Sequence, residues 1–150
     1  MPFPRHYTNE TLEQVALEAS RLFTLDPSVK ILFVEVIPKF RECWGLYNLR
    51  TKIIYVKKQG SLLKMIEVLM HEIVHAKQHK LGIIGLTTNG GLAFKNKTVL
   101  KGDWTYAEMP WEIQANKYMG PMFDTFCRKA NRKLLEAVRE AEVRFQHQIA

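Results

Sequence analysis

The stretch from residue 62 to residue 82, "LLKMIEVLMHEIVHAKQHKLG", constrains the fold more than any other part of the sequence. Its apolar residues predict a long helix that begins after Gly60 and Ser61 and ends near Gly82. Three histidines and a glutamate interrupt the apolar pattern: His71, Glu72, His75 and His79. We therefore expect a helix that packs in the core and carries one polar stripe.

The flanking sequence predicts an α+β domain. The expected elements are a helix at 8–23, strands at 29–37, 41–49 and 52–58, a helix from Pro110 that Gly120 and Pro121 interrupt, and a final helix at 124–148. Residues 83–105 are irregular around the turn signal "TTNGG", which indicates either a lid or specificity loop, or a poorly predicted hairpin. This order predicts one domain over residues 1–150, with an N-terminal helix, a small, three-stranded, mostly antiparallel sheet, the central helix and C-terminal helices.

The composition favours a soluble cytoplasmic protein. A chain of 150 residues can bury a core without disulfides, and its two cysteines, Cys43 and Cys127, form no pairing motif. No signal segment and no run of about 18 apolar residues is visible, so no membrane association is expected. The net charge is +7, but the lysines and arginines are scattered. Scattered cations favour a solvated surface over a nucleic-acid site.

His71, Glu72 and His75 form an H-E-x-x-H motif. The two histidines are four residues apart, so on a helix both imidazoles project from one face and can reach one metal ion. Glu72, next to the first histidine, can hold a water molecule beside the metal and act as general base, as in zinc metalloproteases. The motif specifies only three positions and also occurs by chance. Its position on a strongly helical segment after a strand favours the catalytic interpretation.

A catalytic zinc ion usually has three protein ligands and one open position. His79 continues the spacing, but a straight helix rises about 12 Å from His71 to His79, which is too far for one ion to bridge. Glu112 is the better candidate, because it lies in the first turn of the helix that starts at Pro110, beside bulky apolar residues. Two alternatives stay open. Acidic residues are common at helix N-termini because of the helix dipole, and Glu108 could take the same role.

The segments "HEIVHAKQ" and "PWEIQAN" resemble the gluzincin group of zincin-like metallopeptidases over roughly residues 52–119. The chain looks most similar to the small single-domain bacterial and phage members of that group. This resemblance implies a zincin-like fold and one Zn²⁺ per chain, with His71, His75 and Glu112 as ligands.

Two departures from related patterns are informative. The more distant SprT type uses a third histidine further downstream, whereas no histidine occurs here between His79 and His147. Larger gluzincins have an aspartate four residues after the glutamate ligand, and this chain has Asn116. The sequence therefore leaves open which residue orients the metal-bound histidines.

The resemblance implies zinc-dependent hydrolysis of peptide bonds in an intracellular protein, by zinc-activated water with Glu72 as general base. Tyr106, six residues before Glu112, is a candidate donor to the oxyanion. The alternative for Tyr106 is a core position beside Trp104 and Trp111.

The strand before the metal-binding helix of zincins commonly pairs with an extended substrate. By this resemblance Ile53, Ile54, Tyr55 and Val56 are candidate substrate-binding residues. The two lysines at the end of this strand favour an edge position, and an ordinary interior strand is the alternative.

Two other functions compete with the peptidase. One is a basic DNA-associated protein with an SprT-like role, which predicts salt-sensitive DNA binding. The lack of a compact basic tract weighs against it. The other is a catalytically inactive zincin fold used as a scaffold, which predicts that Glu72→Gln leaves function unchanged.

Overall fold

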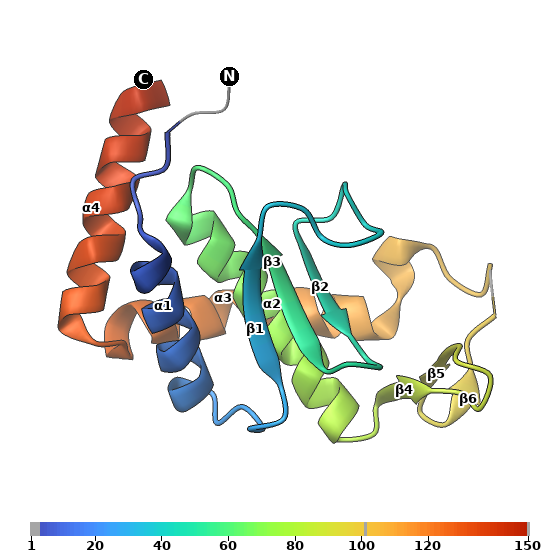
Figure 1. The fold of residues 1–150 in the computed structure, drawn as a ribbon. Coiled ribbons are helices and arrows are strands. Elements are labelled where there is room, and N and C mark those ends of the chain that lie inside the picture. Colours follow the sequence, from blue (N-terminus) through green and yellow to red (C-terminus); the bar gives the residue numbers. More distant parts are fainter. Residues whose placement is uncertain (1–3, 101, 150) are drawn as a thin grey trace.

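Helix α2 (Leu62–Lys80) occupies the middle of the computed structural model, which describes residues 4–100 and 102–149 (Figure 1). The hydroxyl of Ser61 caps its first turn by accepting a hydrogen bond from the Lys64 backbone at 3.2 Å. Beyond its last residue, Gly82 adopts a positive φ of 77°, a conformation that glycine tolerates after a helix. The helix expected from the sequence is therefore present with nearly the expected ends.

The order of the elements confirms the α+β class. They are α1 (Asn9–Leu22), β1 (Lys30–Val34), β2 (Gly45–Asn48), β3 (Ile53–Lys57), α2, β4 (Ile84–Leu86), β5 (Leu92–Phe94), β6 (Lys97–Thr98), the 3₁₀ turn η1 (Tyr106–Glu108), α3 (Pro110–Lys129) and α4 (Arg132–Ile149). In Figure 1, α1 and α4 lie at one end of the molecule and β4–β6 at the other. Among the described residues, no helix is long and apolar enough to cross a membrane.

The first sheet has the strand order β1–β3–β2 and is mixed. β1 pairs in parallel with β3, with Lys30 opposite Ile53. β2 pairs antiparallel with β3, with Gly45 opposite Val56. The expected three-stranded sheet is present, but it is not mostly antiparallel, because β1 pairs in parallel with β3 and only β2 is antiparallel.

The position of β3 in the centre corrects one expectation. Both sides of β3 are paired, so Ile53, Ile54, Tyr55 and Val56 have no free edge for an extended substrate. The backbones of the two lysines at its end are also hydrogen-bonded to neighbouring segments. Lys57 N donates to Trp44 O at 2.8 Å, and Lys58 N donates to Val34 O at 2.7 Å. The interior-strand alternative is therefore the one that the structure contains, and β2 is a free edge instead.

The hydrophobic core surrounds α2. Its completely buried residues include Met65, Ile66, Leu69, Met70 and Ile73. They belong to one cluster with residues of the sheet and the other helices, among them Val15, Ile54, Val56 and Phe126. Because α2 is covered on several sides, its polar stripe must find hydrogen-bond partners inside the domain.

Residues 83–105 contain a second small sheet, of order β4–β5–β6. The "TTNGG" segment is the turn between β4 and β5, in which Gly90 has a positive φ of 84°. Three aromatic rings join this sheet to the start of α3: the centroid of Phe94 lies 6.0 Å from that of Trp104 and 5.3 Å from that of Trp111. The segment therefore forms a hairpin, and the aromatic cluster holds it against the start of α3.

α3 runs without interruption through Gly120 and Pro121, so the expected break there is wrong. Proline removes one helical hydrogen bond. Trp111, Ala115 and Phe126 are buried along the helix on both sides of that position. Burial of this continuous face outweighs the local helix-breaking preference.

The final helix begins at Arg132 and not at residue 124 as expected. The chain leaves α3 at Ala130, whose backbone is extended with φ −67° and ψ 162°. The Asn131 side chain then accepts a hydrogen bond from Lys133 N at 3.0 Å, which starts α4. Residues 124–129 therefore belong to α3.

Candidate metal centre

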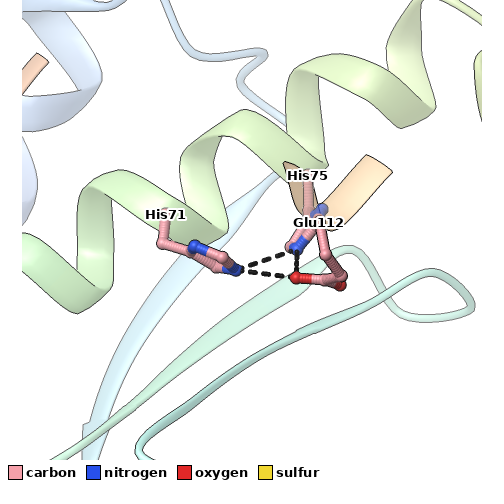
Figure 2. Close-up of side chains that lie close together, drawn as sticks. All are labelled: His71, His75 and Glu112. Atoms are coloured by element: carbon pink, nitrogen blue, oxygen red, sulfur yellow. Dashed lines mark hydrogen bonds and ion pairs between the residues drawn. The ribbon is translucent and has the colours of Figure 1, made fainter. Parts of the chain in front are cut away.

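Two histidines of α2 and one glutamate of α3 converge on one point (Figure 2). Glu112 Oε1 lies 2.9 Å from His71 Nε2 and 3.0 Å from His75 Nε2, and the two nitrogens are 3.2 Å apart. His75 and Glu112 are buried, and His71 is partly exposed. The structure thus brings together the three residues that the sequence singled out as metal ligands.

Local structure explains how each side chain reaches this point. His71 and His75 are one turn apart on α2, so their rings lie on the same face. Pro110 starts α3 at a position where its missing N–H costs no hydrogen bond. Glu112 then falls in the first turn of α3, with its carboxylate directed at α2 (Figure 2).

Gln78 holds His75 in one orientation. This buried amide donates from Nε2 to the Trp111 carbonyl oxygen at 2.9 Å and to Gln114 Oε1 at 2.7 Å. A carbonyl oxygen can only accept, so the amide nitrogen must lie on the α3 side and Oε1 on the side of His75. His75 Nδ1 lies 2.7 Å from that oxygen and donates its proton to it.

Gln78 was not singled out from the sequence, although a glutamine three residues after the second histidine, inside an apolar helix, is a usable signal. Its contact also decides the tautomer of His75. With the proton on Nδ1, the lone pair of Nε2 points at Glu112 and His71. Asn116, at the position of the aspartate in larger gluzincins, is exposed.

The donor set fits a divalent cation. Nε2 of His71, Nε2 of His75 and Oε1 of Glu112 meet at 2.9–3.2 Å, a spacing at which either protons on the imidazoles or a cation must offset the repulsion of their lone pairs. Zinc bonds of about 2.0–2.1 Å at tetrahedral angles place ligand atoms about 3.3 Å apart, close to these separations. Two histidines and one carboxylate are also a ligand set of catalytic zinc.

The surrounding charges favour a cation at the same point. Burial alone would raise the pKa of Glu112, but hydrogen bonds from His71 and His75 hold this pKa at about 2. Burial alone would lower the pKa of His75, but the hydrogen bond to Glu112 and the charge of Glu72 raise it above its ordinary value. Glu112 therefore stays ionised, and its negative charge stabilises positive charge at His75.

Glu72 lies beside the three ligand atoms without joining them. Burial raises the pKa of its carboxyl group, and the charge of His75 and the nearby backbone N–H of Tyr47 lower it in part. Gly45 makes room for this carboxylate, because a Cβ at residue 45 would lie 2.9 Å from Glu72 Oε2 and would also collide with Val68. Glu72 is thus placed between the ligand atoms and the free edge of β2.

Tyr106 lies at the rim of the site. Its hydroxyl donates a hydrogen bond to Glu112 Oε1 at 3.0 Å, while its side chain is exposed. Burial of the hydroxyl and the charge of Glu112 raise its pKa, so it remains a proton-bearing donor. The alternative of a core aromatic is wrong for Tyr106. Trp104 and Trp111 do pair with each other, at 5.7 Å between centroids.

The two competing ligand candidates lie elsewhere. His79 Nδ1 is 2.7 Å from the Tyr47 hydroxyl, and His79 does not belong to the cluster. Glu108 is exposed, and its Oε1 accepts hydrogen bonds from the Thr105 backbone at 3.1 Å and hydroxyl at 2.6 Å. Glu108 therefore caps η1.

Comparisons with protein-family models, curated proteins and solved structures found no match for this chain. The resemblance to gluzincins therefore stays a prediction from two short motifs. What the site does has to be inferred from its own geometry.

Proposed function

We propose that the protein is a zinc-dependent peptidase of the gluzincin type, with His71, His75 and Glu112 as the metal ligands. The observation that carries this proposal is the convergence of three ligand atoms beside a buried carboxylate, Glu72, at the free edge of a strand. Three protein ligands leave one position for water or substrate, as hydrolytic zinc sites require.

When bound, a zinc ion supplies a Lewis acid that polarises a carbonyl group and lowers the pKa of water. Glu72 removes the proton of the attacking water and passes it to the nitrogen of the departing amine. Its raised pKa suits both transfers. Tyr106 turns away from Glu112 and donates a hydrogen bond from its hydroxyl to the negative charge that develops on the carbonyl oxygen.

The substrate backbone pairs with β2 in this proposal. Trp44 O accepts a hydrogen bond from Lys57 N. In an antiparallel pair of strands every second residue is hydrogen-bonded to the partner strand, so Leu46 and Asn48 are the next residues of β2 that bond to β3. Gly45 and Tyr47 then direct their backbone groups away from β3. The N–H and C=O of Gly45 pair with the extended chain next to the general base, since Gly45 lies directly beside Glu72.

The test is Glu72→Gln, with metal content and hydrolysis of an unfolded protein such as casein measured on the same samples. One zinc per chain should remain, and the rate of hydrolysis should fall by about 10²-fold or more, since acid–base catalysis contributes that much. Glu67→Gln is the matched control, because Glu67 lies on the same helix and reaches solvent. It should leave both quantities unchanged.

The outcomes separate the competing functions. A wild-type protein that takes up no zinc at neutral pH overturns the proposal. Zinc binding without hydrolysis by the wild type supports an inactive zincin scaffold. Salt-sensitive DNA binding without hydrolysis supports the DNA-associated alternative.

A further inference from the structure

A groove of about 550 Å³ is lined by residues of β2 and of the second sheet. Phe40 and Leu46 belong to the wall on the side of β2, and Leu86 and Leu92 belong to the wall formed by β4 and β5. Phe40 is 48% exposed and Leu86 is 43% exposed, although both are large and apolar. Exposed apolar side chains that face each other across a groove favour an apolar occupant.

The groove borders β2, the strand whose Gly45 lies beside Glu72 of the proposed peptidase site. Leu46, in the groove wall, directly follows Gly45, and a Cβ at Gly45 would meet Glu72 Oε2 at 2.9 Å. Successive side chains of a strand point to opposite faces, so a chain paired with the free edge of β2 at Gly45 would direct alternate side chains toward the face of Glu72 and toward the groove.

The charged residues of the groove are both cations. Lys39 and Arg50 line it, and no carboxylate does so among the described residues. Neither cation has an ion-pair partner within residues 4–100 and 102–149. Arg50 is held at the end of β2 by a hydrogen bond from its backbone N–H to Asn48 Oδ1 at 2.9 Å. Two unpaired cations beside an apolar groove complement an acidic and apolar ligand.

We infer that this groove selects the substrate: it binds an extended polypeptide segment in which a large apolar side chain is flanked by acidic side chains. The apolar side chain contacts Phe40, Leu46 and Leu86, and the flanking carboxylates face Lys39 and Arg50. This inference rests on the proposed peptidase function, because it assigns the groove to the substrate of that site.

The test measures peptide binding by fluorescence anisotropy to the full-length Glu72→Gln protein, with and without zinc. The probes are blocked fluorescent octapeptides with a central leucine flanked by glutamates, and the same peptide with lysines in place of the glutamates. The glutamate peptide should bind at least about tenfold more tightly, which corresponds to about 1.4 kcal/mol shared by two charge pairs.

Further substitutions test which residues cause the preference for the glutamate peptide over the lysine peptide. K39Q/R50Q should reduce it to less than about twofold. R128Q/K133Q removes the same charge from exposed positions near the junction of α3 and α4, outside the groove, and should leave the preference intact. Leu86→Ser should weaken both peptides about tenfold, because it removes apolar area from one wall.

Equal affinities for the two peptides, or an equal loss of preference in R128Q/K133Q, would overturn the inference. The latter result would assign the preference to the net charge of +7 alone. If the wild type cleaves casein but shows no peptide preference, the groove inference fails and the peptidase function stands. If the preference exists without any hydrolysis, the peptidase function fails and the groove remains a peptide-binding site.

Discussion

His75 and His79 lie one turn apart on α2, but they lie in opposite environments. His75 Nε2 meets His71 and Glu112, and its Nδ1 donates to Gln78. His79 Nδ1 lies 2.7 Å from the hydroxyl of Tyr47, and its ring borders a cavity of about 300 Å³ whose charged lining residues are Lys52, Lys77 and the ion pair of Lys80 with Asp26.

The charges around the two rings shift their pKa values in opposite directions. Burial would lower the pKa of His75, but the hydrogen bond and charge of Glu112 raise it. Burial lowers the pKa of His79, and the nearby charge of Lys52 lowers it further. One ring therefore lies where positive charge is stabilised and the other where it is destabilised. The helical spacing is the same, so the element packed against each ring makes the difference.

The largest expected effect is the difference in zinc affinity between a variant of His75 and a variant of His79. His75→Ala removes a proposed ligand and should weaken zinc binding beyond the ~10–100-fold typical of losing a residue that only supports a ligand. His79→Ala should change the zinc affinity by less than about twofold, because that residue lies outside the cluster. Competition with a chromophoric chelator measures both. Equal losses would show that the cluster of the structure is not the zinc site.

Gly45→Ala should affect catalysis without affecting zinc. The added Cβ would meet Val68 Cγ1 at 2.4 Å and Glu72 Oε2 at 2.9 Å, so relief of these clashes would displace the proposed general base, and a displacement of about 1 Å can cost ~10²-fold in rate. Gly85→Ala is the control, since a Cβ there meets nothing within 4 Å. The two variants are compared by kcat on one peptide and by zinc affinity. A fully active Gly45→Ala would contradict the position assigned to Glu72.

Gln78→Met should reduce zinc affinity by about 10–100-fold, because it leaves His75 Nδ1 without its acceptor and releases the tautomer. Gln114→Met removes only one of the two acceptors of Gln78 and keeps the Trp111 carbonyl, so its effect should be under about threefold. Chelator competition distinguishes the two, and circular dichroism checks that both variants fold. Identical affinities in Gln78→Met and the wild type would remove Gln78 from the site.

The smallest effect concerns His79 and pH. Its pKa is lowered in the folded protein, so below about pH 6.5 the unfolded chain binds more protons than the folded one. Its contribution to stability is complete above that pH and is lost as pH falls towards the folded pKa. Urea unfolding of the metal-free wild type and His79→Gln between pH 8 and pH 5 should therefore show the wild type losing stability relative to the variant. A difference that is independent of pH would contradict the lowered pKa.

Local sequence predicted α2 and the position of the H-E-x-x-H motif on it, because capping and helical spacing involve residues within one or two turns of each other. It also predicted Glu112 in the first turn of the next helix, from Pro110 and the resemblance. The break expected at Gly120 and Pro121 was wrong, since burial of Phe126 and its neighbours on one face decides that region.

Strand order could not be predicted in the same way. The residues of β3 alternate between buried and partly exposed, and the two lysines at its end suggested an edge. β3 is central because β1 pairs with one of its sides and β2 with the other. These pairings depend on residues outside β3, so the pattern within β3 could not predict them. The strands of the second sheet are two or three residues long, which is too short to produce a periodic pattern.

The sequence by itself determined that His71 and His75 share one face of a helix and that Glu72 lies next to them, since this follows from backbone geometry over five residues. Only the tertiary structure decided what that helix faces. Glu112 reaches the histidines, the Trp111 carbonyl orients Gln78, and β2 presents its edge to Glu72. These contacts join residues more than 20 positions apart, and their positions depend on the packing of α2 against α3 and the sheet.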